Sequence, residues 1–133
     1  MVRQMLKLDI GWTVYVYYAV TPSNVWEVMC ALWQIGCRGK DLIDAYRNIS
    51  SGILNNGLTF SNPLRNGSVM VIGMASSQAE FQNTVVHEIG HISTHISQHL
   101  SIDQYGEEKQ YLAGEIGQKM FPVTQKFICG CKI

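Results

Sequence analysis

The 133-residue sequence has no long apolar run and no excess of charge of either sign. Its most apolar stretch, residues 12–20, is nine residues long, whereas a helix that crosses a bilayer needs about 20 apolar residues. The N-terminal segment also lacks the apolar core and small-residue cleavage site of a secretory signal. Ten basic and ten acidic side chains cancel, so no net positive charge attracts nucleic acid. We therefore expect a cytoplasmic protein that binds neither membranes nor nucleic acid.

The four cysteines also lack the paired C-x-x-C spacing of a structural zinc site. Cys30 falls on the apolar side of an expected helix, where a free cysteine behaves as a small hydrophobic residue. Cys129 and Cys131 are separated by one glycine and are compatible with a redox pair. Because we expect an intracellular protein, we interpret these three and Cys37 as reduced thiols.

Length and composition predict a single domain that covers residues 1–133. Domains of about 100–150 residues are common, and 47% apolar with 15% charged residues can form a hydrophobic core. Strands are indicated by β-branched and aromatic runs, and helices by apolar residues at helical spacing. The expected strands cover residues 12–20, 58–61 and 68–73, and the expected early helices cover 22–36 and 39–51.

The longest expected helix follows a capping box, in which Ser77 is the N-cap and Glu80 stands three residues later. Its apolar residues keep a 3.6-residue period as far as Leu100. A final helix is expected from Glu107 towards Lys119, with its end or a kink at Pro122. The predicted fold class is therefore α+β: a small antiparallel or mixed sheet packed with about four helices.

The strongest functional signal is the H-E-x-x-H run that begins at His87 and ends at His91. Residues four apart on a helix share one face, so both imidazoles can reach one zinc ion at about 2.0–2.1 Å. Glu88 lies beside them, where a carboxylate can take a proton from zinc-bound water. The alternative is a solvated surface with incidental histidines, although such polar residues are unusual on a buried face. The pattern predicts one Zn²⁺ per chain, with Glu88 as general base.

A catalytic zinc site needs a third protein ligand and an open position for water. Successive histidines four apart turn by about 40° around the helix, so His99 points away from His87, and His95 is best read as a surface residue. The metzincin pattern is excluded, because Thr94 and Ser97 occupy its glycine and third-histidine positions. We therefore expect an acidic third ligand after the motif. The candidates are Asp103, Glu107, Glu108 and Glu115.

The motif and the run 107–114 together resemble the gluzincin-type metallopeptidases, especially their minimal and phage-associated members. In that group the third ligand is a glutamate in a downstream helix of the form E-x-x-A-[DN]-x-x-[AG]. Glu107 fits best, because Gly114 matches the small residue at which two helices pack closely, and Glu108 is the alternative ligand. Tyr111 departs from the Asp or Asn that orients the first histidine in the family.

The resemblance covers residues 57–120 and implies a zincin-like fold with the H-E-x-x-H run on the long central helix. It implies that strand 68–73 is the sheet edge against which an extended peptide lies. It also implies a Tyr or His that stabilises the tetrahedral oxyanion. The candidates for that role are Tyr105, Tyr111 and His95.

The leading prediction is zinc-dependent hydrolysis of peptide bonds, with His87, His91 and Glu107 as metal ligands and Glu88 as general base. One alternative is a non-catalytic zinc-binding regulator or scaffold that binds a protein partner. Another is hydrolysis of a non-peptide amide at the same site. The sequence leaves the substrate and the oligomeric state open.

Overall fold

The structure is a computed structural model that describes residues 1–52 and 57–129. Within those ranges the chain forms one four-stranded sheet and four α-helices, which confirms the predicted α+β class. Cys131 lies outside the described residues. The strands are β1 (Val2–Lys7), β2 (Thr13–Val20), β3 (Gly57–Asn62) and β4 (Gly67–Gly73), and the helices are α1 (Val25–Gln34), α2 (Gly39–Ser50), α3 (Gln78–His99) and α4 (Glu107–Ile128).

The sheet is mixed, with the strand order β1-β2-β4-β3. β1 and β2 are antiparallel, β2 and β4 are parallel, and β3 and β4 form the predicted antiparallel hairpin. The expectation that strand 68–73 forms the sheet edge is therefore wrong, since β4 lies between two partners and is buried along its length. Its continuous apolar run is typical of a strand covered on both faces. The edge next to the helical site is β3.

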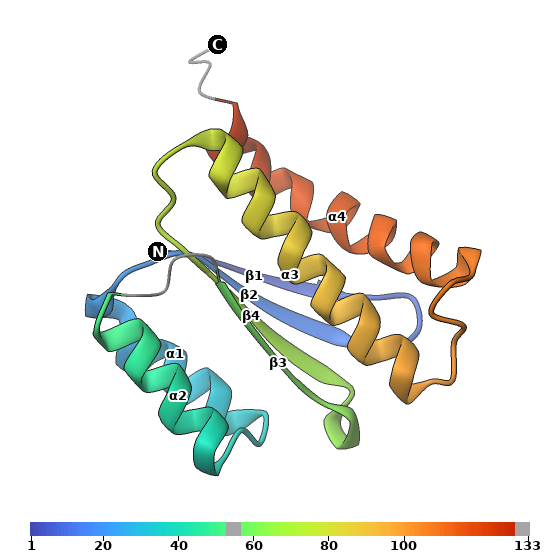
Figure 1. The fold of residues 1–133 in the computed structure, drawn as a ribbon, viewed down its shortest axis with the longest axis horizontal. Helices are drawn as coiled ribbons and strands as arrows, with labels where there is room; N and C mark the ends of the chain where they lie inside the picture. Colours follow the sequence, from blue (N-terminus) through green and yellow to red (C-terminus); the bar gives the residue numbers. More distant parts are fainter. Residues whose placement is uncertain (53–56, 130–133) are drawn as a thin grey trace.

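Helices cover both faces of the sheet (Figure 1): α3 and α4 lie on one side, and α1 and α2 on the other. Alternate side chains of β4 enter the two resulting cores. Met70 and Ile72 pack with α3 and α4, whereas Val69 and Val71 pack with α1 and α2. β4 is thus the wall that both cores share.

Strand β1 is not predicted from the sequence, because its residues are mixed in polarity and Leu6 alone is buried. It is held by antiparallel pairing with β2, in the register Lys7 with Thr13. Gly11, in the turn between them, has φ of +86°, a conformation that glycine adopts without strain. Non-local pairing, which has no local signature, therefore determines this strand.

Helix α4 is longer than expected and continues through Pro122 to Ile128. The proline removes one helical hydrogen bond, but the residues after it are packed against the core. Phe127 stacks on Phe81 and on Tyr18, with ring centroids 4.9 Å and 5.7 Å apart. This burial offsets the lost hydrogen bond and keeps the helix intact.

Helix α3 carries the H-E-x-x-H run and lies between β3 and α4. Its predicted N-cap is confirmed, because Ser77 Oγ accepts a hydrogen bond of 3.1 Å from the Glu80 amide. Helix α3 places its polar motif over the edge of the sheet and its apolar stripe over the sheet centre.

In the described part of the chain, no helix combines the length and the apolar character needed to cross a membrane.

We expect Ile92→Ala to lower the free energy of unfolding by about 2–5 kcal/mol, because deletion of a buried branched side chain leaves a cavity. Ile92 is fully buried in the core beneath α3. Val86→Ala, on the exposed face of the same helix, is the matched control and should change stability by less than about 0.5 kcal/mol. Urea denaturation of both variants measures the difference, and equal losses would contradict this packing.

Candidate metal centre

His87 and His91 meet on the exposed face of α3. Their Nε2 atoms are 3.1 Å apart, and their rings are nearly perpendicular, at 83°. Both side chains are exposed to solvent. Since each imidazole has one nitrogen directed at the other, the pair presents two nitrogen ligands around a single point.

Glu88 completes the group from the inner side of the helix. Its carboxylate is only 3% exposed, and its Oε1 accepts a hydrogen bond of 2.7 Å from the Thr59 hydroxyl on β3. Its other oxygen, Oε2, lies 4.0 Å from His87 Nε2. One ligand atom from each of these three side chains lies within 4.8 Å of the others. The three side chains can therefore surround a metal ion.

The donor set fits a divalent transition metal. Two nitrogens bound tetrahedrally to one zinc ion at about 2.0–2.1 Å would be about 3.3 Å apart, close to the 3.1 Å between the two Nε2 atoms. The Glu88 carboxylate brings a negative charge to the same place, and imidazole nitrogens suit zinc, copper, iron and nickel. Geometry and chemistry thus agree on a metal-binding group without selecting the metal.

Gly57 makes room for the Glu88 side chain at the start of β3. A Cβ atom at this position would lie 2.6 Å from the carbonyl oxygen of Val71 and 3.0 Å from Cγ of Glu88. Both distances are shorter than ordinary contacts, so the absence of a side chain lets Glu88 approach the strand. Sequence reasoning missed Gly57 and Thr59, because neither belongs to a motif near residues 87–91.

Glu107 and Glu108 are not part of the metal-binding group. They are exposed in the first turn of α4, which runs antiparallel to α3 (Figure 1). A Cβ atom at Gly117 would be 3.7 Å from Cδ1 of Ile89, so residue 117 marks the level of the motif. Glu107 lies ten residues earlier, which is about 15 Å along a helix. Its role as third ligand stays a prediction.

Gly114 does not mark a close helix contact, contrary to the expectation from the family pattern. A Cβ atom there would meet nothing within 4 Å. Asp103, another candidate ligand, forms a local contact: its Oδ1 accepts a hydrogen bond of 3.0 Å from the Tyr105 amide. The close approach of two helices that the family pattern implies at Gly114 is therefore not found there.

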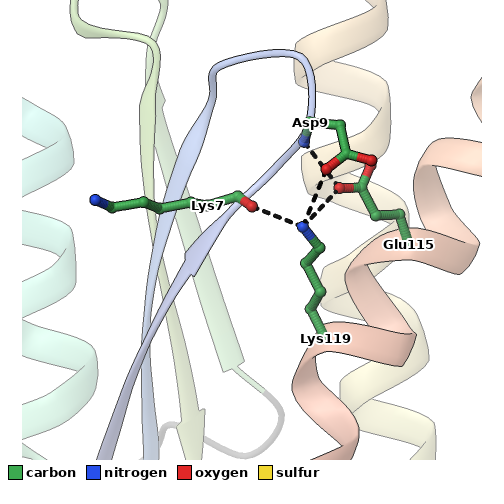
Figure 2. Close-up of polar contacts among 4 residues, drawn as sticks. All are labelled: Lys7, Asp9, Glu115 and Lys119. Carbon is green, nitrogen blue, oxygen red and sulfur yellow. Dashed lines mark hydrogen bonds and ion pairs between the residues drawn. The ribbon is translucent and has the colours of Figure 1, made fainter.

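Glu115 contacts the β1–β2 turn and Lys119 rather than the metal-binding group (Figure 2). Its Oε2 accepts a 2.9 Å hydrogen bond from the Asp9 amide and lies 3.1 Å from the Lys119 ammonium group. Lys119 also donates to the Lys7 carbonyl oxygen at 2.8 Å. These contacts fix the β1–β2 turn to α4, and they explain Glu115 without a metal.

His95 is half-buried and belongs to a hydrogen-bond chain behind the metal-binding group. Its Nδ1 is 2.7 Å from Ser61 Oγ, and its ring centroid is 6.2 Å from that of His91. Burial lowers the pKa of His95 below its usual value, the nearby His91 lowers it further, and Glu88 raises it in part. These effects together favour the neutral imidazole, and the expectation of a simple surface residue is incomplete.

The two tyrosines considered for oxyanion stabilisation are highly exposed, Tyr105 at 97% and Tyr111 at 73%. His99 packs edge-on against Trp12, with ring centroids 6.0 Å apart, and is outside the group, as helix geometry predicts. Of the three candidates for that role, His95 is the one whose ring lies close to His91.

Comparisons with profiles of known protein families, with curated protein sequences and with solved structures found no match. The resemblance to gluzincins therefore stays a prediction, and what the structure supports is the group formed by His87, Glu88 and His91. That geometry supports a metal-binding group and leaves zinc and hydrolysis as proposals.

We expect Gly57→Ala to lower stability by about 1–3 kcal/mol, because the added methyl group must displace backbone or Glu88. Gly114→Ala is the matched control: its Cβ meets open space, so it should raise helix stability by up to about 1 kcal/mol. Thermal and urea unfolding measure both effects. A neutral Gly57→Ala would show that Glu88 does not need the space.

Proposed function

We propose that this protein is a zinc-dependent peptidase whose centre is His87, Glu88 and His91. The observation that carries the proposal is the placement of a buried carboxylate beside two facing imidazoles, all within 4.8 Å. Nothing in the fold requires this arrangement, since a buried carboxylate with few partners costs stability. A site that uses the carboxylate chemically accounts for that cost.

Each residue has a distinct task in this proposal. His87 and His91 hold the ion through their Nε2 atoms. Bound zinc lowers the pKa of water towards neutrality and polarises a carbonyl group. Glu88 accepts the proton from the attacking water and passes it to the leaving amine. The Thr59 hydroxyl, 2.7 Å from Oε1, holds one carboxylate oxygen and leaves Oε2 directed towards His87.

A groove supplies a place for the substrate. It has a volume of about 380 Å³ and lies between α2, the strand β3 and His95, with Thr59 and Ser61 in its lining. Within the described residues β3 pairs only with β4, so its other edge can hydrogen bond to an added strand. We propose that an extended peptide binds along β3, which replaces β4 as the expected docking strand.

The second candidate is a zinc-binding regulator that cleaves nothing. It is favoured by one observation: among residues 1–52 and 57–129, no fourth His, Cys, Asp or Glu joins the group of three. A catalytic zinc normally has three protein ligands and one water. If Glu88 itself binds the ion, it cannot serve as the base, and the site would be structural. Substitution of Glu88 separates the two functions.

We expect purified protein to bind one Zn²⁺ per chain, measured by elemental analysis. Glu88→Gln should keep the metal yet lower peptide turnover by about 10²–10⁴-fold, the usual contribution of a general base. Glu80→Gln, on the same helix but outside the site, is the control and should retain activity. Loss of zinc from Glu88→Gln would instead assign the carboxylate as a ligand and favour the regulator.

The third ligand is tested by Glu107→Gln and Glu108→Gln, each compared with wild type in competition against a zinc chelator. If Glu107 binds the ion, its variant should lose about 10- to 100-fold in zinc affinity, while Glu108→Gln is unchanged. The reverse pattern assigns Glu108. Unchanged affinity in both variants would remove α4 from the metal site.

A further inference from the structure

A chain of hydrogen bonds connects the core to the groove beside the metal-binding group. Trp12 Nε1 donates to Ser68 Oγ at 2.9 Å, Ser68 Oγ is 2.7 Å from Ser61 Oγ, and Ser61 Oγ is 2.7 Å from His95 Nδ1. Trp12 directly precedes β2, and the other three residues lie in β4, β3 and α3. Trp12 and Ser68 are fully buried.

Burial fixes the direction of the two hydrogen bonds that Ser68 makes. An indole N–H is only a donor, so Ser68 accepts from Trp12 and keeps its own proton to donate. The Ser68 hydroxyl is inaccessible, and a buried hydroxyl proton without an acceptor costs about 1–3 kcal/mol. Ser68 therefore donates to Ser61. Ser61 keeps its own proton, and Nδ1 of His95, at 2.7 Å, is a side-chain acceptor within reach of that proton. As an acceptor, Nδ1 carries no proton, and the proton of the neutral ring is on Nε2.

The Nε2 atom of His95 is available to a ligand. Among the described residues, Ser97 Oγ is the one fully buried side-chain polar atom without a partner. Among the described residues no group forms a hydrogen bond with His95 Nε2, and this nitrogen is not one of the fully buried atoms that lack a partner. His95 lines the groove along β3 together with Thr59 and Ser61. The N–H at Nε2 is thus a free donor beside the metal-binding group.

We propose that His95 binds the substrate: Trp12, Ser68 and Ser61 hold it as the Nε2–H tautomer, and that N–H donates to a main-chain carbonyl oxygen of a peptide in the groove. The inference deepens the proposed function and depends on it for the identity of the ligand. His95 is the binding residue, and the other three are positioning residues. A neutral donor suits a carbonyl oxygen, because it needs no counter-charge.

The tautomer is tested without any activity, by ¹⁵N NMR of histidine-labelled protein with and without zinc. We expect the protonated nitrogen of His95 to be Nε2 in wild type, and a mixture of tautomers in Ser61→Ala, where Nδ1 loses its donor. Ser93→Ala is the control and should keep the Nε2–H form, because Ser93 lies in α3 but takes no part in this chain of hydrogen bonds. An Nδ1–H tautomer in wild type overturns the proposal.

Ligand binding is tested on zinc-loaded Glu88→Gln, which should bind peptide without cleaving it. A mixture of capped random hexapeptides is the probe, and we expect the His95 Nε2–H signal to shift on its addition. No shift at millimolar peptide overturns the role of His95. A shift in a protein whose wild type cleaves none of these peptides leaves the His95 proposal standing and contradicts the proposed hydrolysis.

Kinetics provide a further readout where wild type cleaves the mixture. His95→Phe should raise KM by about 3- to 10-fold, the value of one hydrogen bond, with zinc content unchanged. His95→Gln keeps an N–H donor and should recover part of the loss. Val86→Ala, on the exposed face of the same helix, is the control and should behave as wild type. Equal KM for His95→Phe and Val86→Ala overturns the proposal.

Discussion

The hydrogen bond between Thr59 and Glu88 is the contact on which the candidate site depends. It brings a charged carboxylate beneath α3 and against the edge strand, where burial would otherwise be costly. The same contact holds α3 close to β3. Glu88 fits between them because Gly57 has no side chain. The two imidazoles then lie on the solvent side of the helix. The inner face of α3 thereby contributes Glu88 to the metal-binding group, and the outer face contributes His87 and His91.

The rest of the fold supports that contact from behind. α4 packs along α3, and the ion pairs around Lys119 fasten the β1–β2 turn to α4. β4 holds β3 in register and contributes to both cores. Because interiors are densely packed, the position of the edge strand relative to α3 is set by the packing of α4 on α3 and by the pairing of β4 with β3. The scaffold is small, yet it positions a polar group between a helix and a sheet edge.

The sequence predicts the parts of this arrangement that are local. The N-cap at Ser77, the period of α3 and the spacing of His87 and His91 all lie within one helix, so neighbouring residues reveal them. Thr59, Gly57 and Ser61 reach the site through strand pairing, which leaves no pattern near the motif. The same limitation explains why the sequence does not predict β1. The wrong expectation that β4 lies at the sheet edge has another source, because the family resemblance implies it. The end of α4 differs from the prediction for another reason. Packing of Phe127 outweighs the tendency of Pro122 to end a helix.

The contacts of the site differ greatly in the length of chain that they close. His87 and His91 are four residues apart, whereas Thr59 and Glu88 are 29 apart and Trp12 and Ser68 are 56 apart. Closing a longer loop costs more entropy, so the imidazole pair can assemble as soon as α3 forms, and the carboxylate reaches its place only when the sheet is complete. The pairing of the two imidazoles and the placement of the carboxylate are therefore separate steps in the assembly of this group. In a partly folded molecule the two imidazoles can therefore face each other while the Glu88 carboxylate still lacks its contact with Thr59.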